Sequence, residues 1–251
     1  MRVAELWRHP VKSLQGEQCS WAELESSGMV GDRGWGILDT TTGKILTARR
    51  APDLLLAAGH LDGDGVPVVD LPDGTRVEGA GESADERLST WLGRSVRLVP
   101  ALAVETAVAE FFEDATDDTS RAIEWTMPEG RFVDAEPLLV LTTASLRHAA
   151  GLYPEGTWTT RRFRPNIVVD VDGEGWAEDA WLQRELRIGT ATIVPVAQCV
   201  RCTMVTRPQP DLDGDVDIFR TLARNHRGTF GVWATVASPG VVRVDDAVTI
   251  D

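Results

Sequence analysis

Most of the chain consists of short stretches of alternating apolar and polar residues, separated by glycine, proline and aspartate. This period of two is typical of half-buried β-strands. It predicts strands over residues 3–7, 21–24, 35–39, 44–48, 68–71, 75–78, 94–100, 138–141, 166–171, 192–196 and 241–244, the last with a continuation to 250. Two pairs, 35–39 with 44–48 and 68–71 with 75–78, flank turn residues and predict hairpins. The acidic stretch 113–120 lacks a period and predicts a loop.

Helical periodicity is confined to a few segments. Ser83 followed by Glu86 resembles a capping box, and it precedes an apolar helical face that ends at Gly93. Further helices are expected from Thr143 onward and over residues 217–225. Many strands with few helices predict a β-rich α+β protein built on a barrel or a sandwich.

Composition restricts the class of protein further. The chain has 251 residues, 25 of them Lys or Arg and 39 Asp or Glu, which gives a formal net charge of −14. This length suffices for one large domain or two small ones with a substantial core. The acidity argues against nucleic-acid and membrane partners, since both require a basic surface. With no long apolar run and no secretion-signal pattern at the amino terminus, we expect a cytoplasmic protein.

The cysteines and lysines are few. Cys19, Cys199 and Cys202 cannot form an extensive disulfide framework, which agrees with a reducing compartment and leaves a single bond open. Lysine occurs only at Lys12 and Lys44. An arginine-rich composition is typical of a genomic bias, and a lysine retained against that bias is a candidate for a specific role.

The sharpest local feature is the sequence Cys199-Val200-Arg201-Cys202, which follows a predicted strand. A structural zinc site would need two more ligands, and no second cysteine pair exists. A thioredoxin-like pair would lie beside a βαβ pattern, whereas these surroundings are rich in strands. Two interpretations of this cysteine pair remain: two buried, inert cysteines, or a reactive or metal-ligating thiolate at Cys202 beside Arg201.

Three further segments carry positive charge beside turns. Arg161, Arg162 and Arg164 precede a strand and form either a solvated edge or a site for a phosphate or carboxylate. The segments 10–13 (PVKS) and 31–35 (GDRGW) are either ordinary surface turns or places where a cation and backbone N–H groups meet a ligand. The acidic run 211–217 departs from the calcium-loop template and predicts a solvated turn before a helix.

Taken together and in this order, these segments resemble the MOSC family, named after the C-terminal domain of molybdenum cofactor sulfurase. The resemblance covers nearly the whole chain through the segments HPVKSLQGE, GDRGWGILD, FVDAEPLLVLTTASL, RRFRPNIVVD, CVRCTMVT and FGVWATVASPGVVRVDD. It implies a MOSC β-barrel preceded by a smaller N-terminal α/β lobe. It is strongest toward the amidoxime-reducing members, which bind a pyranopterin molybdenum cofactor and reduce N-hydroxylated compounds.

The resemblance also implies a role for individual residues. Cys202 would be the catalytic residue and the protein ligand of molybdenum. Contacts to Mo-molybdopterin would come from Lys12, Ser13, Arg33, Ala135, Glu136, Arg164, Asn166, Val200, Arg201 and Trp233. The phosphorylated cofactor is an anion, so a local cluster of arginines inside an acidic protein would offset its charge. A thiolate is a suitably soft ligand for the metal.

Two departures from the family bear on function. Residues 203–209 differ from the segment that follows the ligand cysteine in the reductases, which leaves the substrate open. Three cysteines cannot supply an iron–sulfur domain, so electrons are expected from a separate electron-donor protein. We expect residues 1–33 and 116–251 to form the barrel core and 34–115 the N-terminal lobe. The expected activity is reduction of N–O bonds; the alternatives are a cofactor carrier and sulfur transfer through a Cys202 persulfide with Cys199 as resolving thiol.

Overall fold

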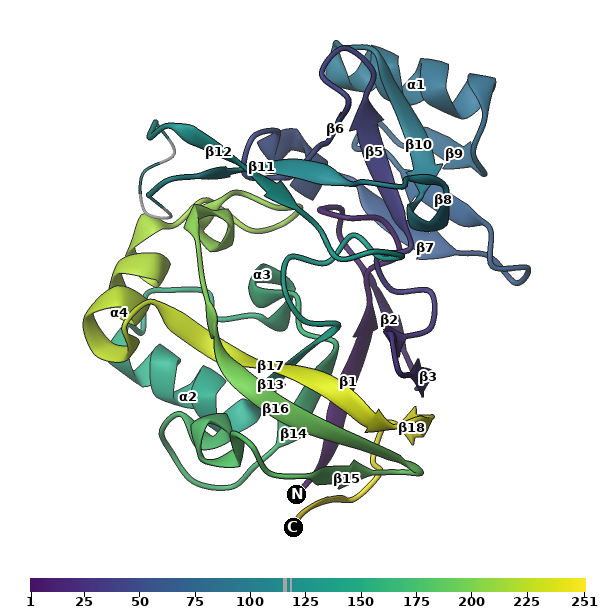
Figure 1. Cartoon of the computed structure of the whole chain (residues 1–251). Helices are drawn as coiled ribbons and strands as arrows, with labels where there is room; N and C mark the ends of the chain where they lie inside the picture. Colours follow the sequence, from purple (N-terminus) through teal and green to yellow (C-terminus); the bar gives the residue numbers. More distant parts are fainter. Residues whose placement is uncertain (115–116, 118) are drawn as a thin grey trace.

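The structure is a computed structural model that describes residues 1–114, 117 and 119–251. Its centre is an eight-stranded sheet (Figure 1). In spatial order the strands are β19 (Val248–Ile250), β15 (Leu186–Ile188), β16 (Ala191–Val200), β17 (Thr229–Ser238), β13 (Leu138–Thr142), β14 (Ile167–Asp170), β1 (Arg2–Arg8) and β2 (Glu17–Cys19). The β13–β14 pair is parallel because two helices, α2 (Thr143–Leu152) and α3 (Thr160–Phe163), carry the chain back between them. The described neighbours elsewhere in this sheet are antiparallel.

Both faces of the large sheet are covered. On one face a core forms with the small sheet of β3 (Trp21–Glu25), β4 (Gly28–Met29) and β18 (Gly240–Arg243). On the other face lie α2, α3 and α4 (Val216–His226). Strand β13 shows how one sequence serves both layers: Val140 packs into the first core and Leu141 into the second, since successive side chains point to opposite faces.

The N-terminal lobe has its own cores. Its elements are β5 (Trp35–Asp39), β6 (Lys44–Ile45), a 3₁₀ turn (Pro52–Leu56), β7 (Ala58–Leu61), β8 (Pro67–Asp70), β9 (Arg76–Glu78), α1 (Glu82–Leu92), β10 (Val96–Pro100), a 3₁₀ turn (Ala101–Ala103) and β11 (Val108–Phe112). Strand β12 (Ala122–Thr126), which follows the predicted boundary at 115–116, pairs with β11. The hairpin β11–β12 extends from this lobe toward the large sheet (Figure 1). The remaining 3₁₀ turns are Ala177–Trp181 and Thr203–Thr206.

The segment that leaves β1 joins the two parts. The backbone of Lys12 donates to Trp35 O at 2.8 Å, and Trp35 N donates to Pro10 O at 3.0 Å. Val11 packs in the core of the N-terminal lobe, whereas Leu6, a few residues earlier, packs in the core of the large sheet. Residues 9–16 therefore lie where the two parts meet. The boundaries at 33–34 and 115–116 stay a prediction.

The β-rich α+β class is confirmed, and several local predictions need correction. The predicted strand 44–48 ends at Ile45, and α1 has Gly81 at its N-cap with no side-chain hydrogen bond, so the capping box at Ser83 is wrong. Strands β2, β4, β7, β11, β12, β15 and β17 and the short helix α3 were not predicted. The three cysteines are free. The predicted loop 113–120 includes residues 115, 116 and 118, which lie outside the described residues.

Candidate functional site

A cavity of about 490 Å³ lies where the N-terminal lobe meets the large sheet. The eleven residues singled out from the sequence all line it: Lys12, Ser13, Arg33, Ala135, Glu136, Arg164, Asn166, Val200, Arg201, Cys202 and Trp233. They come from six separate segments of the chain, so the fold brings together what the sequence keeps apart. Cys199, which the sequence indicated only as a possible resolving thiol, also lines the cavity. The remaining lining residues were not indicated by the sequence: Arg49, Phe111, Phe112, Ile123, Trp125, Val133, Asp134, Leu139, Phe163, Met204 and Val205.

Three residues of the site have an unusual backbone conformation. Ser13, Arg33 and Arg164 have φ values of 70°, 49° and 57°, in the left-handed region that side chains with a Cβ rarely adopt. Arg164 ends α3 in this conformation, and its N–H donates to Thr160 O at 2.9 Å. Such strain persists only where the surrounding structure fixes the residue, and it concentrates at functional sites.

Arg33 is held by a network of oxygen acceptors. Its guanidinium pairs with the buried carboxylate of Asp32, and Asp32 also accepts from the backbone N–H of His9 at 2.7 Å. A second bond runs from Arg33 Nη1 to Asn166 Oδ1 at 3.3 Å. Asn166 is fully buried and accepts from Leu139 N through the same oxygen, at 3.1 Å. Asn166 therefore orients Arg33 from within the sheet.

Arg164 brings positive charge into the cavity wall with no carboxylate hydrogen-bonded to it. Its guanidinium donates to the backbone carbonyl of Leu14, and only 5% of the residue is exposed. Burial, reinforced by the nearby Arg33, lowers the pKa of Arg164 to about 9. The protein thus leaves much of this charge uncompensated, as a site for an anion would.

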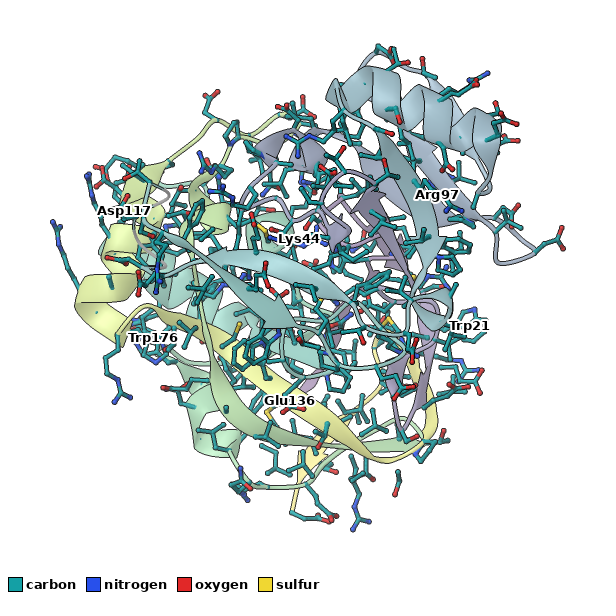
Figure 2. The ribbon with its side chains drawn as sticks, turned by 45° about the horizontal axis from the view of Figure 1, so that its top comes forward. Trp21, Lys44, Arg97, Asp117, Glu136 and Trp176 are labelled. Carbon is teal, nitrogen blue, oxygen red and sulfur yellow. The ribbon has the colours of Figure 1, made fainter. Side chains whose placement is uncertain are left out.

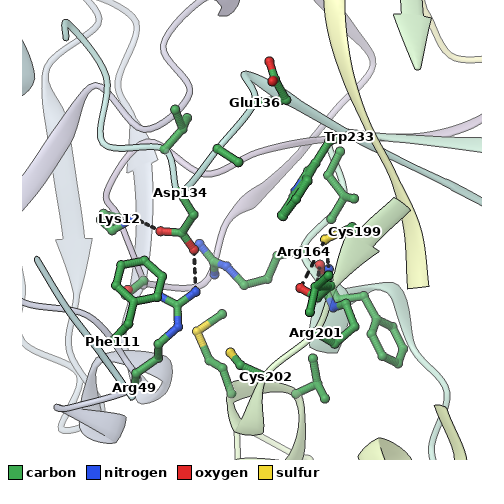
Figure 3. A pocket seen from close by; sticks show the side chains of 18 of the residues that line it. Lys12, Arg49, Phe111, Asp134, Glu136, Arg164, Cys199, Arg201, Cys202 and Trp233 are labelled. Atoms are coloured by element: carbon green, nitrogen blue, oxygen red, sulfur yellow. Dashed lines mark hydrogen bonds and ion pairs between the residues drawn. The ribbon is translucent and has the colours of Figure 1, made fainter. Parts of the chain in front are cut away.

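Asp134 lies between two cations. Its carboxylate accepts from Lys12 Nζ at 2.6 Å and from Arg49 Nη2 at 2.6 Å (Figure 3). Although burial opposes the charged form, Arg49 and Lys12 hold the pKa of the Asp134 carboxyl well below its usual range. Burial lowers the pKa of Lys12, and Asp134 offsets this only in part. A second acceptor, the carbonyl of Phe132, lies 2.9 Å from Lys12 Nζ.

Glycine at position 36 allows the Phe132 carbonyl to reach Lys12. A Cβ at this position of β5 would lie 2.7 Å from the Phe132 ring, so a larger residue would displace the segment that carries Phe132. The same segment continues to Asp134, Ala135 and Glu136. The Glu136 carboxylate points away from the other labelled side chains in Figure 3. Of this segment, Asp134 is therefore the side chain directed at the cations.

The two cysteines of the CVRC sequence have different surroundings. Cys199, at the end of β16, is buried, and burial raises the pKa of its thiol despite the guanidinium of Arg201 at 3.0 Å from Sγ. Cys202 lies beyond the strand and lines the cavity, with Arg49 to one side and Arg201 to the other (Figure 3). Cys202 interacts with Arg49 and, after Asp134, is the group that raises the pKa of Arg49 against the effect of burial.

The arginines in and directly after α3 have different roles. Arg162 is only 2% exposed, and its guanidinium donates to the carbonyls of Thr157 at 3.0 Å and Asp213 at 2.6 Å. It fixes the loops behind the cavity, so the solvated-edge alternative is wrong for Arg162 and for Arg164. Arg161 does not line the cavity.

Two polar atoms in the cavity wall have no hydrogen-bond partner among the described residues. Arg49 Nε and Arg201 Nε are buried and make no hydrogen bond, although Arg201 Nη2 donates to Phe163 O at 2.8 Å. A buried donor without an acceptor costs free energy, and an anionic ligand would supply the acceptor. The cavity thus offers cations, unpaired donors and one thiol to a ligand.

Comparison with known proteins identifies the family. The MOSC domain profile matches residues 128–249, and that of the MOSC N-terminal beta barrel domain matches residues 1–118. The chain belongs to the MOSC family. Mitochondrial amidoxime-reducing component 1 from Mus musculus is 27% identical to this MOSC protein over 98% of this chain and 81% of the relative. The Homo sapiens protein of the same name is also 27% identical, over 98% of this chain and 82% of the relative. Molybdenum cofactor sulfurase from Oryza sativa subsp. japonica is 25% identical over 80% of this chain and 28% of the relative.

Solved structures resemble the MOSC chain only distantly. The YuaD protein from Bacillus subtilis has a TM-score of 0.49 at 11% identity, covering 99% of this chain and 94% of the other. YiiM from Geobacillus stearothermophilus has a TM-score of 0.35 at 16% identity, covering 46% and 54%. Values this low carry no argument. In the part of the chain that the structure describes, no helix is long and apolar enough to cross a bilayer.

Proposed function

We propose that the protein is a molybdenum-cofactor-dependent oxidoreductase that reduces the N–O bond of N-hydroxylated compounds with electrons from a separate donor protein. One observation carries the proposal: a single cavity combines an accessible thiol, at Cys202, with Arg164 and Arg201, whose guanidinium groups donate to backbone carbonyls and form no ion pair with a described carboxylate. The names of the 27%-identical relatives supply the reaction class.

The residues of the cavity fit a phosphorylated dithiolene cofactor. Arg33, Arg164 and Arg201 present guanidinium groups, which suit phosphate oxygens, and the unpaired Arg201 Nε is a donor such a group would satisfy. Among the described residues no cluster of three or more His, Cys, Asp or Glu side chains is placed to hold a metal. A metal at Cys202 would therefore take its other ligands from a cofactor, and the Cys202 thiolate is a suitable soft ligand.

When bound, the cofactor would supply two-electron redox chemistry to a substrate oxygen. The reaction for an amidoxime is R–C(NH₂)=N–OH + 2H⁺ + 2e⁻ → R–C(NH₂)=NH + H₂O. The N–O bond breaks, the oxygen leaves as water, and the electrons come from a redox protein that donates them. The chain's own contribution is to hold the Cys202 thiolate and to offset negative charge through Arg164 and Arg201.

The test is an N-reduction assay with the cofactor-loaded enzyme, an aryl amidoxime and a reduced dye as electron donor. We expect wild type and Cys199→Ser to form the amidine and Cys202→Ser to be inactive. Cys199→Ser is the matched control, because it removes the neighbouring thiol without touching the proposed ligand. Retained reduction by Cys202→Ser would refute the mechanism.

The alternatives predict different results in the same variants. A cofactor carrier would bind the cofactor through its arginines and show no turnover. In sulfur transfer, substitution of Cys199 would trap a persulfide on Cys202, detectable as a mass increase of one sulfur atom. The buried Cys199 thiol, with its raised pKa, is a poor resolving nucleophile, which favours the reductase.

A further inference from the structure

The hairpin β11–β12 gives the cavity a wall of a different chemical character. Phe111, Ile123 and Trp125 line the cavity, and they share one face of the hairpin because Phe111 pairs with Ile123 and Ala109 pairs with Trp125. The Phe111 and Trp125 rings meet edge to face, with centroids 6.2 Å apart. The hairpin thus gives the cavity an apolar, largely aromatic side, and Arg49 is a cation in contact with it.

These apolar side chains are exposed although they border a cavity. Trp125 is 48% exposed and Ile123 is 40% exposed, whereas Ala109 on the same face is fully buried. Large apolar groups gathered at the mouth of a cavity are typical of a ligand-binding surface. They come from a different part of the chain than Arg33, Arg164 and Arg201, whose guanidinium groups fit a phosphorylated cofactor.

The other face of the hairpin fixes the wall in place. Glu110 and Glu124 lie directly opposite each other, an arrangement of like charges that destabilises a sheet. Lys44 Nζ neutralises the pair, at 2.6 Å from Glu110 Oε1 and 2.8 Å from Glu124 Oε1 (Figure 2 labels Lys44). The Arg49 guanidinium lies 4.1 Å from the Phe111 ring centroid and connects the wall to Cys202. One of the two lysines of the chain therefore serves to hold this hairpin.

We propose that Phe111, Ile123 and Trp125 form the substrate-selecting wall and favour N-hydroxylated substrates with a flat apolar body. The inference rests on the proposed function and specifies its substrate class. The aromatic body of the substrate packs on Trp125 and Ile123, and its N–OH group then faces the side of the cavity that holds Cys202. A small polar N-hydroxylated compound gains nothing from the wall.

The experiment compares benzamidoxime with acetamidoxime, which carry the same reacting group on an aryl and a methyl body. We expect Trp125→Ala to lower kcat/KM for benzamidoxime about five- to tenfold through KM, and to leave acetamidoxime within about twofold. Trp125→Phe restores most of the preference. The matched control is Trp21→Ala, since Trp21 is 56% exposed on β3 at the opposite edge of the molecule (Figure 2).

Equilibrium binding separates this inference from the proposed function. Without an electron donor, oxidised holoenzyme binds benzamidoxime with no turnover, and the Kd should rise in Trp125→Ala but not in Trp21→Ala. If wild type shows this pattern of benzamidoxime binding but reduces neither amidoxime, the proposed function is refuted and the substrate-selecting wall is supported. If wild type reduces both amidoximes and Trp125→Ala leaves their kcat/KM ratio within twofold, the wall is refuted and the function stands. Equal Kd values for the two amidoximes in wild type also overturn the proposal.

Discussion

Replacing Asp134 with asparagine measures how far one carboxylate stabilises the cations of the cavity. The carboxylate makes charge-assisted contacts of 2.6 Å to Lys12 and 2.6 Å to Arg49. Each such bond contributes about 1.5–3 kcal/mol to the free energy of unfolding when it is buried. About a third of the Asp134 side chain is exposed, so solvent screening reduces the sum of the two. We expect a loss of about 2–3 kcal/mol, since asparagine keeps the shape and leaves both cations without an anion.

The assay is urea unfolding of the chain produced without cofactor, followed by tryptophan fluorescence. Asp70→Asn is the matched control, because Asp70 also accepts two hydrogen bonds from a cation, 2.7 and 3.1 Å from Arg76, but on an exposed surface. Screening makes such a surface pair weak, so its loss should be much smaller. Equal losses in the two variants would refute the view that Asp134 stabilises the cations of the cavity more than an exposed carboxylate stabilises a surface arginine.

Three further predictions concern the hairpin, a buried acid and the arginine network. Lys44→Gln should speed hydrogen exchange of the β11 and β12 amides while leaving β13 unchanged, because the opposed Glu110 and Glu124 lose their shared cation. Burial raises the pKa of Glu178, so its contribution to stability is present below the unfolded value of about 4.5 and is lost as pH rises through the raised pKa. Urea unfolding should therefore show Glu178→Gln gaining stability relative to wild type as the pH is raised above about 4.5. Arg33→Lys should retain less cofactor on gel filtration than wild type, because an ammonium cannot reproduce the bonds to Asp32 and Asn166.

The sequence indicated eleven residues that line one cavity, because most of them lie in short motifs beside turns. Lys12 and Arg164 come from segments whose order matches the family, and the structure lines one cavity with them. Arg49 lies outside the segments that resemble the family. Asp134 lies inside one of them, FVDAEPLLVLTTASL, but was not predicted as a site residue. Their importance depends on the crossing of residues 9–16 between the two parts of the molecule, which no local pattern encodes.

For two of the strands that the sequence pattern failed to predict, the structure shows a physical reason. Strand β17 contains Gly231 at φ 78°, where a Cβ would lie 2.8 Å from Val140 O, and this interruption breaks the alternating pattern. Strand β12 does alternate, with Ile123 and Trp125 on one face and Glu124 on the other, but it spans only five residues and exposes its apolar side chains instead of burying them in a core. Ile123 and Trp125 line the cavity, whereas Gly231 is required by the close approach of β17 to β13.

Molybdenum content tests the central claim most directly. Wild type, Cys202→Ser and Cys199→Ser would be expressed in a host that makes the cofactor, and metal and pterin fluorescence would be measured in each folded protein. The account predicts stoichiometric molybdenum and pterin in wild type and Cys199→Ser, with the metal lost in Cys202→Ser. Folded wild-type protein without metal and pterin, or full molybdenum in Cys202→Ser, would contradict it.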